Sequence, residues 1–318
     1  MKHHSWRSIR LKILNGDPEV INYERILKMS QINGWLLYTK EDYERNSVFA
    51  QRFLDLGNNQ KSSIELVFKD DIYYGVSQNG LCLSGADGRP LKAPGFVINR
   101  SIDPLFTRHL EKLGSRVFNS SLTAEICNDK ARTYMEVSRL RLPMADTLFI
   151  DKKTLMRGQF SLGWPAVLKT AGGRGGKEVF LVHSLDELLE SAGNLKSEKF
   201  VLQKLSGSPG RDVRVFVVGK NIVGAVLRLS KNGGFKANFS LGGTAEPYTL
   251  NETEQNMVNT IINHFDFGMV GIDFIFDEKG GFLFNEIEDV VGSRTLSMTS
   301  DTDIVKLYLE HIYRCLVL

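Results

Sequence analysis

Cysteine is scarce in this chain, and its few cysteines lie far apart. The three are Cys82, Cys127 and Cys315, with no C-x-x-C spacing. The sequence therefore predicts neither a zinc site nor a disulfide framework. This low cysteine content fits a reducing compartment, and we expect a cytoplasmic protein.

Long apolar runs and a strong net charge are also missing. No run approaches the length of a membrane span, and the residues after Met1 lack the apolar core of a Sec signal, so we expect neither a membrane-embedded nor a secreted protein. The formal net charge of +3 is too small to indicate a nucleic-acid partner. A content of 42% hydrophobic and 24% charged residues over 318 positions is typical of a globular protein with two or three domains.

The chain lacks a Walker A motif but has another glycine-rich loop. Between two strand-like runs lies the sequence L-K-T-A-G-G-R-G-G-K-E-V, and no Ser or Thr follows its Gly-Lys pair. The glycines are Gly172, Gly173, Gly175 and Gly176, and the nearby cations are Lys169, Arg174 and Lys177. Glycines let backbone amides approach phosphate oxygens, and the cations attract them. Because no helix pattern follows, we predict a flap that folds over phosphates.

Three carboxylates gather around two apolar runs near the end of the sequence. Residues 271–294 predict a β-hairpin that turns over residues 277–281. Glu286 and Glu288 lie two apart and share a face of one strand, and Asp273 lies on the other. A hard cation such as Mg²⁺ takes oxygen ligands, usually one or two carboxylates completed by water and substrate phosphates. We therefore predict a metal site formed by Asp273, Glu286 and Glu288, close to a nucleoside triphosphate.

Alternating strand and helix patterns predict α/β structure along the whole chain. In the first part we expect a helix at 20–32, a strand at 35–38, a polar loop at 39–46, a helix at 47–56 and a strand at 64–68. These make a βαβ unit, which short strands at 72–83, a strand at 95–100, a helix at 104–113 and a strand at 116–119 extend. Later we expect helices at 129–140 and 184–192, and strands at 147–150, 200–203, 213–218 and 222–229.

The order of these motifs resembles the ATP-grasp superfamily, specifically its RimK-like branch of amino-acid and peptide ligases. The resemblance covers residues from about 119 to the C-terminus and includes the blocks 211–228 and 233–243. It implies an α/β (α+β) protein with the ATP-grasp fold. The implied domains are an N-terminal open α/β pre-ATP-grasp domain over 1–120, a central lid subdomain with the glycine flap over 121–203, and a C-terminal mixed α/β subdomain with the metal site over 204–318.

The resemblance also implies which residues bind the nucleotide. Besides the flap glycines, the matching positions are Lys130, Lys169, Gln203, Lys204, Leu205, Asp212 and Asn238. In the family the two lysines bind nucleotide phosphates, and the three hinge residues read the adenine edge through backbone groups. The aspartate is the candidate for a ribose hydroxyl, and the asparagine lies beside the phosphates and the metal.

One segment departs from the family pattern. The family usually has Glu-x-Asn followed by a Ser/Ala-Pro-Gly turn, whereas here Glu288 replaces the asparagine and Asp289-Val290-Val291-Gly292 follows. Glu288 adds a negative charge to the metal site, and without the proline turn glutamate should not be assumed as the added amino acid. The candidates for catalytic cations are Arg214, Arg228, Lys236 and Arg294. Of these, Arg294 is the new candidate to bind a substrate carboxylate, since arginine suits bidentate binding.

The implied function is an ATP-dependent carboxylate–amine ligase that forms an amide through an acyl phosphate. The implied cofactors are ATP and Mg²⁺, with Mn²⁺ as the alternative metal. The implied substrates are a small-molecule or peptide carboxylate and an amine, or a protein terminus, without nucleic acid or membrane. A homodimer is a common default for such enzymes, and nothing in the sequence selects it.

Other interpretations stay open from the sequence. An ATP-binding regulatory or partner protein of the same fold would lack ligase turnover, and a phosphotransferase would release a stable phosphorylated product. Arg214 and Arg228 are alternatively structural partners in salt bridges. The glycine loop is alternatively a plain hairpin turn, and the acidic hairpin a solvated surface.

Overall fold

The described part of the chain divides into two α/β units. The computed structural model describes residues 32–58, 62–158, 160–207, 209–230 and 243–317. The first unit lies within Met1–Ser101, His109–Phe118 and Val305–Leu318, and the second within Ile102–Arg108 and Asn119–Ile304. The predicted helix at 20–32 lies, except for its last residue, outside the described residues, as do Lys236 and Asn238.

The first unit contains a parallel four-stranded sheet in the order β2-β1-β5-β6. Its strands are β1 (Asn33–Tyr38), β2 (Ser63–Phe68), β5 (Phe96–Asn99) and β6 (Arg116–Phe118). Leu36 and Leu37 of β1 are fully buried, as expected for a central parallel strand covered on both faces. The predicted βαβ unit is confirmed, because β1 and β2 pair in parallel across α3 (Lys40–Asn58).

The predicted loop at 39–46 is wrong, because α3 already begins at Lys40. Thr39 caps the helix: its Oγ1 accepts a hydrogen bond from the Asp42 backbone N–H at 3.1 Å and donates to the Asp42 carboxylate at 2.9 Å. The helix is kinked at Asn46, whose φ of −131° is not helical. This kink separates the polar first turns from the apolar periodicity that follows, so the sequence pattern showed only the second half.

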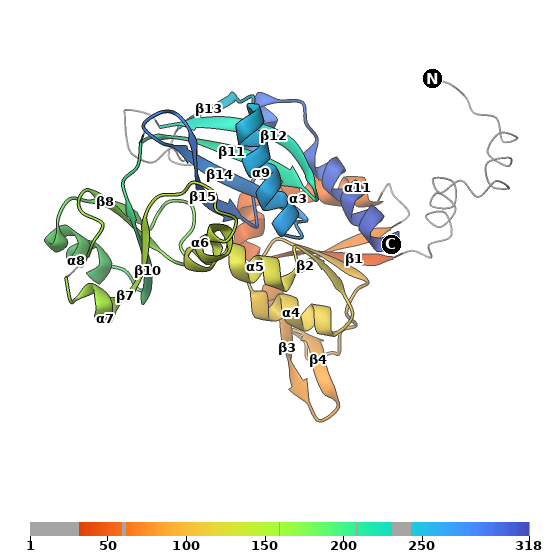
Figure 1. Cartoon of the computed structure of the whole chain (residues 1–318). Coiled ribbons are helices and arrows are strands. Elements are labelled where there is room, and N and C mark those ends of the chain that lie inside the picture. The colour runs from red at the N-terminus through yellow and green to blue at the C-terminus, as the bar shows by residue number, and fades with distance from the viewer. Residues whose placement is uncertain (1–31, 59–61, 159, 208, 231–242, 318) are drawn as a thin grey trace, which may run out of the picture. The chain divides into compact units, whose positions relative to one another are not determined.

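A hairpin and the C-terminal helix complete the first unit. The short strands predicted at 72–83 are confirmed as β3 (Ile72–Ser77) and β4 (Gly80–Gly85), which form a separate antiparallel hairpin (Figure 1). The C-terminal helix α11 (Ile304–Val317) packs here through Tyr308, whose ring lies edge-on to Phe53 at a centroid distance of 6.1 Å. Helix α4 (Pro104–Lys112) lies between β5 and β6 in the chain.

The second unit contains two antiparallel sheets. The first has the order β7-β10-β8-β9 and is formed by β7 (Thr147–Asp151), β8 (Ala166–Thr170), β9 (Val179–Val182) and β10 (Lys199–Lys204), with α7 (Lys152–Leu155) and α8 (Leu185–Gly193). Leu168, Leu188 and Phe200 form part of its core. The predicted hairpin around the glycine loop is confirmed, because β8 and β9 pair in antiparallel fashion.

The other sheet of this unit has the order β13-β12-β11-β14-β15. Its strands are β11 (Arg211–Val218), β12 (Asn221–Leu229), β13 (Thr244–Pro247), β14 (Met269–Phe276) and β15 (Phe282–Glu288), and its helices are α5 (Ser121–Cys127), α6 (Lys130–Ser138), α9 (Glu252–His264) and α10 (Arg294–Thr299). Helix α9 crosses one face of the sheet, where Val258 and Ile261 are fully buried (Figure 1).

The predicted acidic hairpin is confirmed, with an irregularity that the sequence did not show. Asp273 pairs with Glu286 and Phe274 pairs with Phe284, so Asn285 is an extra residue on β15. Such a β-bulge breaks the strict alternation of faces. As a result Phe284 is fully buried while Glu286 reaches the functional site described below.

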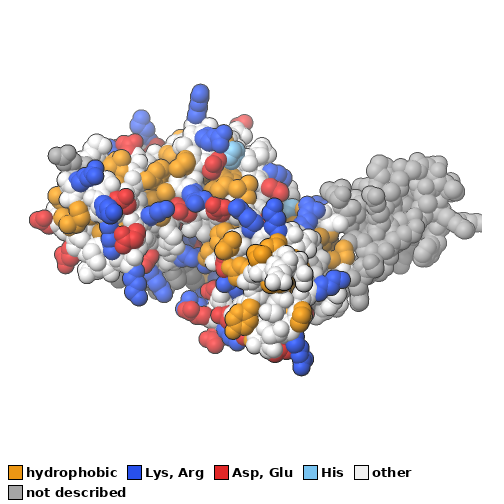
Figure 2. All heavy atoms as spheres, turned by 90° about the horizontal axis from the view of Figure 1, so that it is seen from below, with side chains coloured by type: hydrophobic (Ala, Val, Ile, Leu, Met, Phe, Trp, Pro, Cys, Tyr) orange, Lys and Arg blue, Asp and Glu red, His pale blue; other side chains and the backbone are white. Residues whose placement is uncertain are grey.

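The surface of the described residues carries side chains of both charge signs (Figure 2). No helix among these residues is both long and apolar enough to span a bilayer. Acidic and basic side chains are interspersed on the face in Figure 2.

Candidate functional site

A cavity of the second unit collects most of the predicted nucleotide-binding residues. Its lining includes Lys130, Lys169, Gly173, Gly175, Gly176, Gln203, Lys204, Leu205, Asp212 and Glu286. These residues come from helix α6, the flap, the end of β10 and the strands β8, β11 and β15. Gly172, also predicted, does not line the cavity. Residues separated by more than 150 positions thus share one concave surface.

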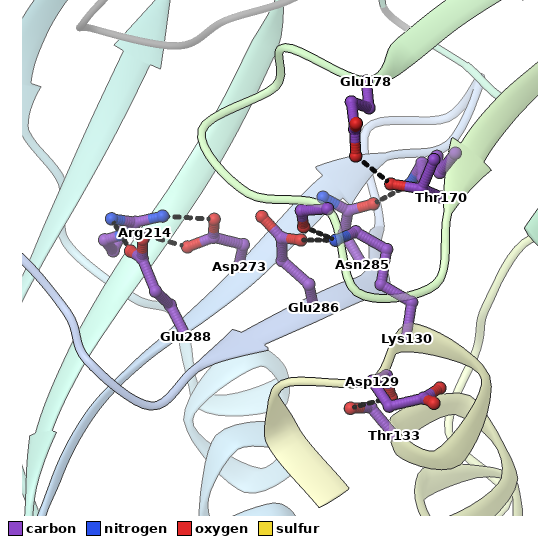
Figure 3. A network of polar contacts seen from close by, with 12 residues as sticks. Asp129, Lys130, Thr133, Thr170, Glu178, Arg214, Asp273, Asn285, Glu286 and Glu288 are labelled. Carbon is purple, nitrogen blue, oxygen red and sulfur yellow. Dashed lines mark hydrogen bonds and ion pairs between the residues drawn. The ribbon is translucent and has the colours of Figure 1, made fainter. Parts of the chain in front are cut away.

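The glycine flap is held at its base. Thr170 Oγ1 donates a hydrogen bond to Glu178 Oε2 at 2.6 Å across the loop (Figure 3). The backbone N–H of Lys130 donates to the Ala171 carbonyl at 2.8 Å, and the Lys130 side chain donates to the Gly173 carbonyl. Lys130 therefore fixes the flap to the N-terminus of α6. Thr170 and Glu178 were not predicted from the sequence, because a polar pair at the foot of a loop has no distinctive pattern.

Lys169 is a buried amine held by a residue that the sequence analysis also missed. Its side chain donates to Asn285 Oδ1 at 2.8 Å. Burial lowers the pKa of Lys169 to about 8, although the nearby Glu286 carboxylate opposes this shift. Asn285 is the bulged residue of β15, and the bulge aims its side chain at the amine. The only signal in the sequence is a polar residue directly after the apolar run F-L-F.

The predicted hinge lies at the end of β10, where its backbone is partly engaged. The Lys204 N–H donates to the Asp146 carbonyl at 2.9 Å, and the Leu205 N–H donates to the Pro165 carbonyl at 3.4 Å. The hydrogen bond of Leu205 is long, so it is weaker than that of Lys204. The Gln203 side chain is buried and donates to Thr147 Oγ1 of β7 at 2.9 Å, so this donor is already engaged within the sheet.

Arg214 and Arg228 both bind the buried carboxylate of Asp273. Arg214 donates to its two oxygens from Nε and Nη2, each at 2.7 Å, and Arg228 donates to Oδ2 at 2.7 Å. Arg228 also forms a bidentate pair with Asp212 at 2.6 and 2.9 Å. Burial alone would raise the pKa of Asp273, but the two guanidinium groups outweigh it and hold the value at about 2. Neither arginine lines the cavity.

The two glutamates of β15 face cations as well. Glu288 pairs with Arg214, and Glu286 lies 3.6 Å from the Lys130 amine (Figure 3). In the part of the chain that the structure describes, no three His, Cys, Asp or Glu residues form a ready group for a metal ion. The predicted trio occupies neighbouring positions of β14 and β15, and each carboxylate is neutralised by a lysine or an arginine.

The formal charges of this network cancel. The carboxylates are Asp212, Asp273, Glu286 and Glu288, and the cations are Lys130, Lys169, Arg214 and Arg228. Since buried charges are costly unless they are paired, this balance stabilises the arrangement. An anion that binds Lys130, Arg214 or Arg228 must therefore compete with a carboxylate of the protein.

The segment after β15 is anchored by asparagines rather than by a proline turn. Asp289 is buried and accepts hydrogen bonds from the side chains of Asn119 and Asn128, the latter at 2.9 Å. Asn119 also donates to the Met269 carbonyl at 3.0 Å. These hydrogen bonds hold the end of β15, where this sequence has no proline turn. The sign of this difference in the sequence was Asp289, which follows Glu288 where the family usually has a Ser/Ala-Pro-Gly turn.

Arg294 is placed apart from the cavity. It is the first residue of α10, it is exposed, and it does not line the cavity. Arg211 instead lines the cavity and lies over the Phe276 ring at 3.9 Å from its centroid. Arg211 was not predicted as a site residue, although it stands one residue before Asp212.

Comparisons with known proteins agree on one family. The profile described as the RimK-like ATP-grasp domain matches residues 129–312. Human N-acetylaspartylglutamate synthase A is 29% identical over 220 residues, which cover 67% of this chain and 56% of that protein. The chain thus spans little more than half the length of this relative.

Solved structures show the same fold. D-alanyl-alanine synthetase A from Vibrio cholerae superimposes with a TM-score of 0.69 at 15% identity, covering 91% of this chain and 100% of that one. The ATP-grasp ligase PsnB, solved with a precursor variant, Mg and ADP, gives a TM-score of 0.63 at 14% identity, with 90% and 98% covered. At these identities the likeness establishes the fold.

Proposed function

Because this chain belongs to the RimK-like ATP-grasp family, we propose that it is an ATP-dependent carboxylate–amine ligase. One observation carries the proposal: a single cavity is lined by the flap, the hinge at the end of β10, two lysines and Glu286. A flap and cations suit a polyphosphate, and a backbone hinge suits a base. The donor and acceptor are a small-molecule or peptide carboxylate and an amine.

The proposed reaction has two steps. A carboxylate oxygen of the donor attacks the γ-phosphorus of ATP, which gives an acyl phosphate and ADP. The amine then attacks the acyl carbon, loses a proton and expels inorganic phosphate. Phosphoryl transfer depends mainly on positioning and charge neutralisation. Lys130 and Lys169 supply the cations that hold phosphate oxygens, and the flap excludes water from the acyl phosphate.

The oxygen ligands present fit a magnesium ion, with Mn²⁺ as the alternative. Glu286 and Glu288 share a face of β15, and their side chains are 35% and 27% exposed, whereas the Asp273 side chain is fully buried between arginines. Two carboxylates suffice for Mg²⁺ when phosphates and water complete its shell. Asp273, the third predicted ligand, would have to release an arginine. A bound Mg²⁺ would neutralise charge on the phosphate oxygens.

Trapping the acyl phosphate tests the proposal. The protein is incubated with ATP, MgCl₂, a pool of amino acids and dipeptides, and hydroxylamine, and the products are analysed by mass spectrometry. We expect ADP together with a hydroxamate of the donor carboxylate. If the protein binds ATP but forms neither ADP nor a hydroxamate, the result would instead support a regulatory protein that lacks turnover.

The buried Lys169 predicts that phosphate binding weakens at alkaline pH. Its pKa of about 8 in the free protein rises when a phosphate binds, because the anion favours the charged amine. ATP affinity should therefore fall as the pH rises above 8, by up to about tenfold per unit. Calorimetric titrations with ATP from pH 7 to 9.5 measure this slope. The Lys169→Met variant should bind weakly with a flat profile above pH 8, and an equal slope in both proteins would contradict the assignment.

The conformation of the flap glycines predicts an effect on how tightly ATP use is coupled to amide formation. Gly175 has φ +63°, a left-handed conformation that disfavours a side chain. Gly175→Ala should therefore distort the closed flap and raise the ratio of ADP to amide several-fold, because more acyl phosphate is hydrolysed. Gly172→Ala is the matched control, since a Cβ at Gly172 would meet nothing within 4 Å. Equal ratios in the two variants would argue against a water-excluding flap.

A further inference from the structure

We propose that Glu288 masks Arg214 from anions and releases it only when Glu288 takes a divalent cation as its partner. The released guanidinium edge then binds a phosphoryl oxygen. The proposal rests on the ligase function above, since it concerns the same site, and it assigns a role to the residue at which this chain departs from the family pattern.

Arg214 spans three strands of the sheet. It lies on β11 opposite Asp273 of β14, to which Nε and Nη2 donate at 2.7 Å each, and its remaining Nη1 reaches Glu288 on β15 (Figure 3). Carboxylates of the protein therefore lie against Nε, Nη1 and Nη2 of this guanidinium. In this state Asp273 and Glu288 neutralise the charge of Arg214, which weakens its attraction for a substrate anion.

A glycine makes this reach possible. Gly271 pairs with Glu288 across β14 and β15, and the Arg214 side chain lies against it. A Cβ at Gly271 would stand 3.1 Å from Arg214 Cδ and 2.8 Å from a methyl group of Val291. A side chain at this position would require Val291 and the Arg214 side chain to shift, so the glycine leaves the space in which the arginine lies.

Glu288 is the partner that can be exchanged. The Asp273 side chain is completely buried, whereas that of Glu288 is 27% exposed. Glu288 Oε2 is buried against Arg214 but makes no hydrogen bond within the described residues. Glu288 Oε2 is thus close to a positive charge but accepts no well-aligned hydrogen bond. A divalent cation would be a better partner for this oxygen.

The arginine lies where a released donor is useful. Arg214 follows Asp212 by two residues on β11, so the two share a face of the sheet, and Asp212 lines the cavity. Glu286, also in the lining, is two residues from Glu288 on β15. An asparagine at position 288 would leave the empty network with one net positive charge and Arg214 permanently available. With glutamate at position 288, Arg214 can bind an anion only after a cation has bound Glu288.

Binding of inorganic phosphate tests the proposal without turnover. Isothermal titration calorimetry measures the phosphate affinity of the full-length chain and of Glu288→Gln, with and without MgCl₂. Without Mg²⁺ we expect Glu288→Gln to bind phosphate at least about tenfold more tightly than the unmodified protein, because a neutral amide releases Nη1. With saturating Mg²⁺ the difference should fall to less than about threefold, because Glu288 then has another partner.

Two further variants identify the group responsible. Glu278→Gln removes one negative charge from the exposed turn of the same hairpin, and it should bind phosphate like the unmodified protein. Adding Arg214→Lys to Glu288→Gln should remove the gain, since lysine lacks the planar fork. Thermal melting verifies that each variant is folded.

Two results would overturn the proposal. One is equal phosphate affinity of the unmodified protein and Glu288→Gln without Mg²⁺, including no measurable binding by either. The other is a gain that persists in the double variant, which would assign it to another cation. Neither result depends on ADP or hydroxamate formation, so a failure of the proposed ligase activity is recognised separately by the trapping experiment.

Discussion

Glu286→Gln should lower the turnover number at least about 100-fold and leave the fold intact. Glu286 lines the cavity, lies 3.6 Å from the Lys130 amine and is one-third exposed. Glutamine has the same shape as glutamate but lacks the negative charge that would bind a metal ion and that faces Lys130. We expect this to weaken transition-state stabilisation by several kcal/mol. Steady-state ADP release measures the effect.

The melting temperature separates this loss from misfolding. A partly exposed side chain contributes little to the core, so the midpoint of Glu286→Gln should stay within about 2 °C of the unmodified protein. Glu278→Gln, at the exposed turn of the same hairpin, should retain full activity. If Glu286→Gln kept more than about a tenth of the turnover, the assignment of Glu286 to the reacting phosphates would be wrong.

Asp273→Asn, unlike Glu286→Gln, should cause a large loss of stability. The Asp273 side chain is completely buried and binds both Arg214 and Arg228. Removing its charge leaves two buried guanidinium groups short of a partner, which costs about 3 kcal/mol even though Asp212 and Glu288 remain. For a unit of this size the melting temperature should fall by about 6 to 12 °C, as measured by calorimetry.

The pH dependence of stability gives the control for this variant. The pKa of Asp273 is lowered to about 2 in the folded protein, below its ordinary value near 4. Its stabilising effect is therefore complete above about pH 4 and is lost as the pH falls toward 2. Asp273→Asn should lack this part of the acid dependence. A variant as stable as the unmodified protein at pH 7 would show that the arginine network does not support the fold.

The features predicted correctly were those with short-range patterns. Apolar runs bounded by glycine placed the hairpins β8–β9 and β14–β15, and the first βαβ unit followed from periodicity. Three of the four flap glycines, the two lysines and the hinge line one cavity, and their binding roles stay a prediction from motif order. Thr39 shows the limit, because a capped polar first turn carries no apolar periodicity and was interpreted as a loop.

What the sequence could not show depends on long-range geometry. The bulge at Asn285 depends on how β14 and β15 pair, so neither its contact with Lys169 nor the orientation of Glu286 follows from spacing alone. Arg214 and Arg228 were candidates for substrate binding and alternatively for salt bridges. The structure places both in salt bridges, because Asp212 and Asp273 lie on facing strands far apart in the chain.

Transfer of oxygen from the donor carboxylate to phosphate tests the proposed chemistry most directly. The donor identified as a hydroxamate is labelled with ¹⁸O in its carboxylate, and the phosphate released during amide formation is analysed by mass spectrometry. An acyl phosphate predicts one ¹⁸O atom in each inorganic phosphate, because the attacking oxygen leaves with the phosphoryl group. Unlabelled phosphate, or label in AMP instead, would contradict the proposed mechanism.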